Sequence, residues 1–87
     1  MSNEWSRQTM LEETFLDMRG IKPEIYYQRT SGNSYRIKLN YNDKEVILKE
    51  VLENGLTKEA TMEYDGIATL FKSMYDAETE ATRILKE

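Results

Sequence analysis

The segment SYRIKLNY, residues 34–41, constrains the fold of this chain more than any other, because apolar and polar residues alternate through it without interruption. Successive side chains of a β-strand point to opposite faces of a sheet, so a period of two predicts a strand with one buried and one exposed face. The expected buried residues are Tyr35, Ile37, Leu39 and Tyr41. The expected exposed residues are Ser34, Arg36, Lys38 and Asn40.

A second strand is expected just before it, in EIYYQRT, with SGN as the loop of a hairpin. A three-residue loop sets Ile25 opposite Leu39, whereas a two-residue loop sets Gln28 opposite Ile37. A slip of one residue moves every side chain of a strand to the opposite face. We therefore predict the three-residue loop, which leaves Tyr26 facing outward.

A third strand follows the turn NDK and again has a period of two, with Val46 and Leu48 inward. The outward residues of the three strands form one candidate partner-binding face, made of Tyr26, Gln28, Arg36, Lys38, Asn40, Ile47, Lys49 and Val51. This face stays bare if both helices of the domain lie on the other side of the sheet. It is covered if one helix lies on each side.

The next segment, LENGLTKEATMEY, is compatible with a fourth strand. A three-residue loop at residues 53–55 would set Leu48 opposite Ala60 and Glu50 opposite Lys58. Such a register stabilises a sheet, because it pairs apolar side chains with each other and opposite charges with each other. The outward face would then continue into Thr57, Glu59, Thr61 and Glu63.

The same residues also carry a helical period. A single helix over residues 57–86 would be about 45 Å long, an awkward rod for a small domain, and it would enclose Gly66 at a cost of about 1 kcal/mol. We therefore expect the hairpin, followed by a last helix that Asp65 caps. The apolar stripe expected on that helix is Ile67, Leu70, Phe71, Met74, Ala81 and Leu85.

An N-terminal helix is expected from Ser2 or Asn3 to Arg19, where Gly20 ends it. Its apolar side consists of Leu11, Phe15 and Met18, with Met10 and Thr14 beside them. Trp5 lies away from this stripe. We expect Trp5 to pack at the edge of the core rather than to anchor a partner.

These elements make a single α+β domain over residues 1–87: an N-terminal helix, an antiparallel meander of three to four strands, and a C-terminal helix packed on the sheet. The expected centre of the core is Tyr35, Ile37, Leu39, Val46, Leu48, Phe71 and Met74. Glu78 falls within the apolar stripe of the last helix. We expect its carboxylate to pair with a basic neighbour such as Arg29, or to have a pKa raised by burial.

The residue types on which most enzymes and metal sites depend are missing, because the sequence has no cysteine and no histidine. We therefore expect no catalysis, no cofactor and no metal ion. No apolar run approaches the roughly 20 residues that cross a bilayer. The first residues do not form a basic tip followed by an apolar stretch, so we expect a cytoplasmic protein.

Charge is unevenly distributed along the chain. The formal net charge is −4, yet residues 18–49 carry seven lysines and arginines against three acids, and both ends are acidic. Basic groups over a few apolar and aromatic residues favour a recognition surface. We expect a protein-binding module, an inhibitor or adaptor of the kind that mobile elements encode, which uses its sheet face or acidic helices. An exposed sheet edge also permits a homodimer.

An alternative function comes from the segment YRIKLNYNDKEVILKEVLENGLTKEA, less than a third of the chain. It resembles the arm-binding domains of tyrosine recombinases, in which three strands precede a helix with a similar Thr-Lys-Glu-Ala start. The resemblance implies a helix from Thr57 onward and a sheet that reads the major groove of DNA. The residues in contact with DNA would be Arg36, Lys38, Asn40 and Lys49. The negative net charge opposes binding driven by phosphates.

Overall fold

A computed structural model describes residues 3–87, with side chains from residue 7 onward. Its elements are α1 (Asn3–Thr14), the π-helical segment η1 (Phe15–Arg19), β1 (Glu24–Arg29), β2 (Ser34–Tyr41), β3 (Lys44–Glu53), β4 (Leu56–Tyr64), β5 (Ile67–Phe71) and α2 (Met74–Lys86). The expected cap at Ser2 and the side chain of Trp5 lie outside this description. The α+β architecture is confirmed, with five strands instead of three to four.

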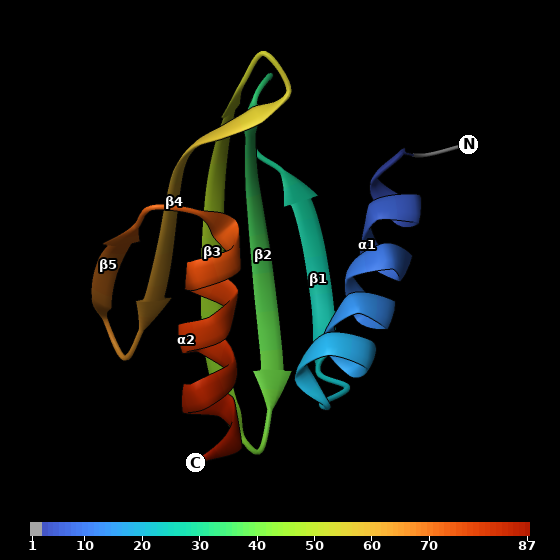
Figure 1. Cartoon of the computed structure of the whole chain (residues 1–87), viewed down its shortest axis with the longest axis vertical. Coiled ribbons are helices and arrows are strands. Elements are labelled where there is room, and N and C mark those ends of the chain that lie inside the picture. The colour runs from blue at the N-terminus through green and yellow to red at the C-terminus, as the bar shows by residue number, and fades with distance from the viewer. Residues whose placement is uncertain (1–2) are drawn as a thin grey trace.

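The strands form one antiparallel meander in the order β1-β2-β3-β4-β5, so each strand pairs with the next one along the chain (Figure 1). The predicted register of the first hairpin is confirmed, with Ile25 opposite Leu39. Thr30 donates its backbone N–H to the carbonyl of Ser34 at 2.8 Å and so closes the three-residue loop. A hairpin with this loop keeps the apolar residues of β1 and β2 on one face.

The other three connections within the sheet are two-residue turns at residues 42–43, 54–55 and 65–66, and both residues of each turn have positive φ. This conformation is the type I′ turn, whose twist matches that of the strands it joins and which favours Asn, Asp and Gly. The three-residue loop expected at residues 53–55 is therefore wrong. Asn54 and Gly55 form a complete turn, and Glu53 stays in β3 opposite Leu56.

The shorter turn shifts β4 by one residue relative to the expected register, and a β-bulge between Val51 and Leu52 shifts it by one more, so the rest of β4 is displaced by two residues. Leu48 lies opposite Met62 instead of Ala60, and Glu50 lies opposite Ala60 instead of Lys58. A shift of two residues returns every side chain to the same face, because the period of a strand is two. The expected faces of residues 59–64 therefore survive an incorrect register.

A β-bulge between β3 and β4 changes the face of one predicted residue. Val51 lies opposite Glu59, whereas Leu52 lies opposite Thr57, so one residue of β4 has no opposite residue on β3. The extra residue of a bulge reverses the alternation beyond it. Thr57, which we expected on the outward face, lies instead on the inner face, where its hydroxyl donates to Glu50 Oε2 at 2.7 Å.

The expectation that the last helix begins at Asp65 is wrong. Asp65 and Gly66 turn the chain back along β4, and Ile67–Phe71 forms β5. Ile67 and Leu70, expected on the buried helical stripe, are 67% and 68% exposed. The helical spacing of these apolar residues did not decide their structure, because the type I′ turn before them commits the chain to a strand.

Helix α2 begins after Ser73, whose side chain accepts the backbone N–H of Asp76 at 3.2 Å and caps the helix. Its buried face contains Ala77, Ala81, Thr82, Ile84 and Leu85, so the predicted burial of Ala81 and Leu85 is confirmed. Two alanines on this face let the helix backbone approach the sheet closely.

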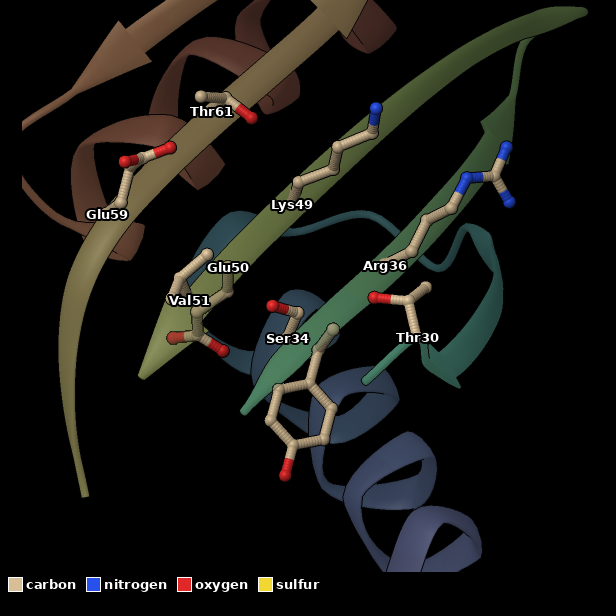
Figure 2. A pocket seen from close by; sticks show the side chains of 9 residues that line it. Thr30, Ser34, Arg36, Lys49, Glu50, Val51, Glu59 and Thr61 are labelled. Carbon is tan, nitrogen blue, oxygen red and sulfur yellow. The ribbon is translucent and has the colours of Figure 1, made fainter. Parts of the chain in front are cut away.

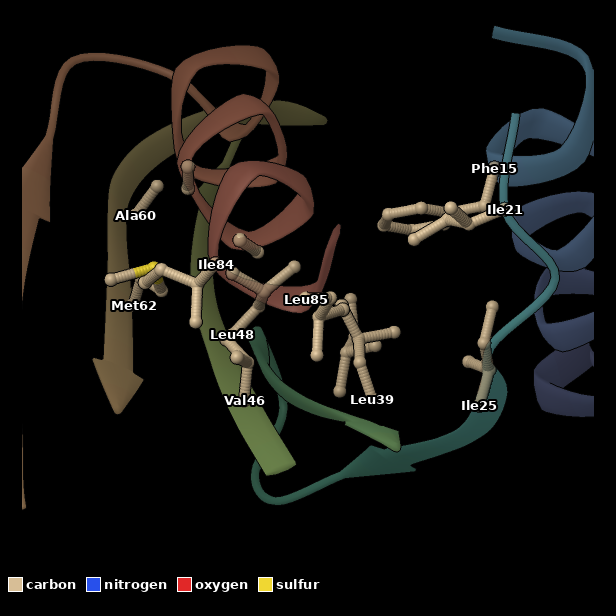
Figure 3. Close-up of a cluster of buried hydrophobic side chains, with 13 residues drawn as sticks. Phe15, Ile21, Ile25, Leu39, Val46, Leu48, Ala60, Met62, Ile84 and Leu85 are labelled. Carbon is tan, nitrogen blue, oxygen red and sulfur yellow. The ribbon is translucent and has the colours of Figure 1, made fainter. Parts of the chain in front are cut away.

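The core lies between the sheet and the helices (Figure 3). Its buried apolar residues are Phe15, Ile21, Ile25, Ile37, Leu39, Val46, Leu48, Ala60, Met62, Ala77, Ala81, Ile84 and Leu85. The predicted core residues Ile37, Leu39, Val46 and Leu48 are confirmed. Phe71 and Met74 are half-buried and pack against the core, and Tyr35 is half-buried outside it. Burial of each large side chain contributes about 1.5–3 kcal/mol.

The apolar stripe predicted for the N-terminal helix is only partly buried, and the π-helical segment η1 accounts for the exposure of Met18. Phe15 is fully buried, but Met10 and Met18 are both 60% exposed. A π-helix places more residues in each turn than an α-helix and so rotates the side chains that follow. Met18 turns outward as a result, and Arg19 turns inward.

Both helices lie on the same side of the sheet, α1 against β1 and α2 across β2 to β5 (Figure 1). The sequence left open whether the helices cover one side of the sheet or both. The structure has two layers, the sheet and the helices, and the opposite side of the sheet carries no helix among residues 3–87. Within the described residues, no helix has the length and apolar character needed to cross a membrane.

The type I′ turns predict a specific response to glycine substitution. Gly55 has a φ of 79°, so we expect Gly55→Ala to lower the free energy of unfolding by about 1–2 kcal/mol. Gly32 has no such φ, and a methyl group added at its Cα would meet no atom within 4 Å. Gly32→Ala should therefore change stability by less than about 0.5 kcal/mol. Urea denaturation of both variants measures the difference, and equal stabilities would contradict the turn assignment.

Candidate functional site

The side of the sheet without helices, which we call the open face, is defined by rows of directly opposed residues. One row is Gln28, Arg36, Lys49, Thr61 and Leu70, and the next is Tyr26, Lys38, Ile47, Glu63 and Ala68. Shorter rows hold Ser34, Val51 and Glu59, and Glu24, Asn40 and Glu45. The structure therefore brings all eight predicted partner-binding residues together on one face.

Lys38 is already engaged within the chain. Its ammonium lies 3.8 Å from Glu45 Oε1 and 5.1 Å from the centre of the Tyr26 ring. The Tyr26 hydroxyl in turn donates to Glu24 Oε2 at 3.3 Å. These contacts offset the positive charge of Lys38 and hold Tyr26 over it, so this part of the open face is electrostatically balanced.

Arg36 and Lys49 lie directly opposite each other on β2 and β3. Neither makes an ion pair or a side-chain hydrogen bond with any residue among the described side chains. Like charges at directly opposed positions destabilise a sheet, because their Cβ atoms are only about 4.5–5.5 Å apart. Two adjacent positive charges are thus held on the open face without an ion pair to any acid among the described side chains.

These two cations border an open hollow with a volume of about 380 Å³ (Figure 2). The residues that line it are Thr30, Ser34, Tyr35, Arg36, Lys49, Glu50, Val51, Glu59 and Thr61. Hydroxyl groups from Thr30, Ser34 and Thr61 can donate hydrogen bonds here, beside the arginine and lysine donors. The hollow therefore offers hydrogen-bond donors and positive charge where Arg36 and Lys49 line it. Glu59, on the neighbouring strand β4, adds a negative charge to the lining.

The opposite side of the sheet contains charged groups whose neighbours differ from the expected ones. Glu50 is only 5% exposed and lies on the inner face with Val46 and Leu48. Its Oε2 accepts the Thr57 hydroxyl, and its Oε1 lies 3.7 Å from Arg7 Nη2. The alternation of β3 already places residue 50 inward, and this signal could have identified Glu50 as a buried acid.

Glu78 lies beside Arg19 instead of the expected Arg29, at 3.9 Å between Oε1 and Nη2. Arg29 instead donates to the backbone carbonyls of Ser31 and Gly32. Burial raises the pKa of Glu78 above its ordinary value, and the positive charge of Arg19 partly opposes the rise. The expectation of a basic neighbour and that of a raised pKa are therefore both met, with a different arginine.

Arg19 joins the N-terminal helical segment to α2. It donates to Thr79 Oγ1 at 2.9 Å and to the carbonyl of Tyr75 at 3.3 Å, and its guanidinium lies 4.5 Å from the centre of the Tyr75 ring. These contacts join residues that are 56 and 60 positions apart in the sequence. The charged groups of the inner side thus fasten the two helices to each other and to the sheet.

No cluster of three or more potential ligand residues is present among the described residues to hold a metal ion. Comparison with models of protein families, with curated proteins and with solved structures finds no match to this chain. The helix from Thr57 that the resemblance to arm-binding domains implies is wrong, because Leu56–Tyr64 is a strand. Function is therefore inferred from the geometry of the chain's own residues.

The raised pKa of Glu78 predicts a pH dependence of stability. Between the ordinary value of 4.5 and the raised value, the native state keeps a proton that the unfolded chain has released. The contribution of Glu78 to the free energy of unfolding is therefore complete below pH 4.5 and is lost as pH rises through the raised pKa. Glu78→Gln should remove this fall in unfolding free energy, as measured by urea denaturation at a series of pH values.

Glu80→Gln is the matched control on the same helix. Arg83 holds the pKa of Glu80 below its ordinary value, so its contribution has the opposite sign and is lost as pH falls. This control should retain the fall in stability that Glu78 causes. An unchanged pH profile in Glu78→Gln would show that Glu78 is not the group responsible.

Proposed function

We propose that this chain is a non-catalytic protein-binding module, an inhibitor or adaptor, that covers an acidic surface of its partner with the open face. The observation that carries the proposal is the pair Arg36 and Lys49, which lie opposite each other and make no ion pair among the described side chains. A repulsive pair costs stability in the free protein. A carboxylate of the partner would offset this repulsion and accept charge-assisted hydrogen bonds from both side chains.

Apolar side chains surround the charged pair in the way that protein interfaces require. Ile47 and Val51 are half-buried beside the two cations, while Tyr26 and Leu70 are more exposed toward opposite edges of the sheet. Aromatic and arginine residues are enriched in interfaces and often supply most of the binding energy. The open face therefore combines polar anchoring groups with apolar area that a partner can cover.

The size of the face fits a protein partner. Five strands about 4.8 Å apart and eight residues of about 3.3 Å each give a face of about 24 by 26 Å, or about 600 Å². A standard protein interface covers about 800 Å² on each partner. The open face thus supplies most of such an interface, and residues at its rim can supply the remainder.

Other residues of the face favour a protein over DNA. Glu24, Glu45, Glu59 and Glu63 lie on the same side of the sheet as the two cations. These carboxylates would repel a phosphate backbone, and the chain has a formal net charge of −4. The alternating charges suit a protein partner with a complementary pattern. The absence of cysteine, and hence of disulfides, agrees with a cytoplasmic location.

Charge reversal on the open face tests this proposal. We expect the tagged chain to recover a partner from a lysate of its source cells, and the double variant Arg36→Glu, Lys49→Glu to reduce recovery at least tenfold. The control Lys22→Glu, Lys86→Glu makes the same change in net charge away from the open face and should keep the partner. Equal recovery with both variants would reject the open face as the contact surface.

Retention on immobilised double-stranded DNA distinguishes the DNA-binding alternative from the proposed protein-binding function. The wild-type chain should pass through the column at low salt. Retention that weakens steeply with salt and is abolished by the Arg36 and Lys49 reversals would instead support the sheet-based DNA-binding alternative through Arg36, Lys38, Asn40 and Lys49.

A stability measurement on the isolated chain gives an independent test. Lys49→Glu places a carboxylate opposite Arg36, so we expect it to raise the free energy of unfolding by about 0.2–1 kcal/mol while it weakens partner binding. Lys58→Glu is the control, since it removes the exposed pair with Glu53 and should lower stability slightly. A loss of stability in Lys49→Glu would show that Lys49 is already balanced in the free protein.

A further inference from the structure

Strand β5 forms one edge of the sheet, and nothing among the described residues pairs with its outer side (Figure 1). Its sequence, IATLF, contains no charge, no proline and no bulge, and its first four residues are exposed. Proteins usually protect such edges with charged residues, proline, bulges or a covering helix. The other edge, β1, has Glu24 and Arg29 at its ends and α1 packed against it. Edge β5 also contacts a helix, α2, but it has no charged residue within the strand.

The hydrogen-bonding groups on the free side of β5 follow from the turn before it. Tyr64 and Ile67 flank the two-residue turn and are therefore a hydrogen-bonded pair. Antiparallel pairs alternate between hydrogen-bonded and non-hydrogen-bonded, so Ala68 and Leu70 direct their backbone N–H and C=O groups away from β4. Ala68 and Leu70, one on each side of Thr69, thus direct their backbone donors and acceptors toward the outer side of the edge.

We propose that β5 pairs in antiparallel orientation with β5 of a second copy, around a twofold axis at Thr69. Ala68 of each copy then forms a hydrogen-bonded pair with Leu70 of the other, and the two Thr69 side chains face each other as a non-hydrogen-bonded pair. The outward groups of Ala68 and Leu70 match this register without any change in the strand. The resulting interface is isologous, as in most homodimers.

Charge complementarity favours a second copy of this chain as the occupant. Asp65 precedes β5 and Lys72 follows it, and neither makes an ion pair among the described residues. In the proposed register Gly66 lies opposite Lys72 of the second copy, so that each Lys72 comes next to Asp65 of the other copy. Parallel pairing would bring like charges together instead. The two ends of the strand therefore select antiparallel self-pairing.

The dimer also covers the apolar side chains that the monomer leaves exposed on β5. Leu70 would lie beside Ala68 of the second copy on the open face, and Ile67 beside Phe71 of the second copy on the helix side. Ile67 and Leu70 are the two large apolar residues of β5 that are mostly exposed in the single chain. Their burial supplies a hydrophobic contribution that hydrogen bonds at a sheet edge alone do not.

A charge-complementation experiment tests the twofold axis. We expect the wild-type chain to be a dimer by sedimentation equilibrium, and both Thr69→Lys and Thr69→Glu to be monomers, because each places like charges directly opposite each other. An equimolar mixture of the two variants should form a heterodimer, since lysine then faces glutamate. Recovery in the mixture also shows that both variants are folded.

The outcomes that overturn the proposal are equally specific. A wild-type chain that stays monomeric up to millimolar concentration, a Thr69→Lys variant that remains a dimer, or a mixture that stays monomeric would each reject pairing about Thr69. Thr69→Val is the uncharged control and should dimerise. The open-face variant Arg36→Glu, Lys49→Glu should dimerise as well, so failure of this dimer is distinguishable from failure of the proposed partner binding.

Discussion

The alternation of side chains between the two faces of the sheet is the constraint on which the rest of this structure depends. Every turn and bulge must either preserve that alternation or reverse it at a defined position. The three-residue loop and the turn at residues 42–43 preserve it, so Ile25, Leu39 and Leu48 all reach the same core. The bulge beside Thr57 reverses it at the start of β4, and this reversal turns Ala60 and Met62 toward the same core.

The two faces use charge in opposite ways. On the inner side, Glu50 and Glu78 are largely removed from solvent, and Arg7 and Arg19 lie near them, so that opposite charges fasten the helices to the sheet. A buried acid without its arginine would carry a large desolvation cost. On the open face, Arg36 and Lys49 are held together without such compensation. The difference indicates that their charge is directed outward.

The sequence predicted the parts of the fold that a simple period specifies. The alternation in residues 34–41 identified the buried residues of β2, and the same period in β3 placed Lys49 on the open face. The register of β4 was wrong because Asn54-Gly55 completes a turn without a third residue and because the bulge adds one unopposed residue to β4. The predicted faces of residues 59–64 were nevertheless correct, because a displacement of two residues leaves each side chain on the same face of the sheet.

The remaining errors come from elements whose sequence fits two structures. IATLF has apolar residues at both helical and strand spacing, and the turn at Asp65 decides between them. The π-helical segment at Phe15 has no distinctive sequence signal, so the inward rotation of Arg19 and its contact with Glu78 could not be anticipated. The candidate site was predicted more fully than the core, because it depends only on the faces of β1 to β3.

Paramagnetic relaxation of side-chain methyl groups by a soluble, neutral probe tests the central claim most directly, since neighbouring residues of β3 should differ sharply. Ile47 and Val51, on the open face, should relax strongly, whereas Val46 and Leu48, beneath the helices, should be protected. Equal protection of all four residues in the monomeric chain would mean that a helix or another segment covers the open face and would contradict the account.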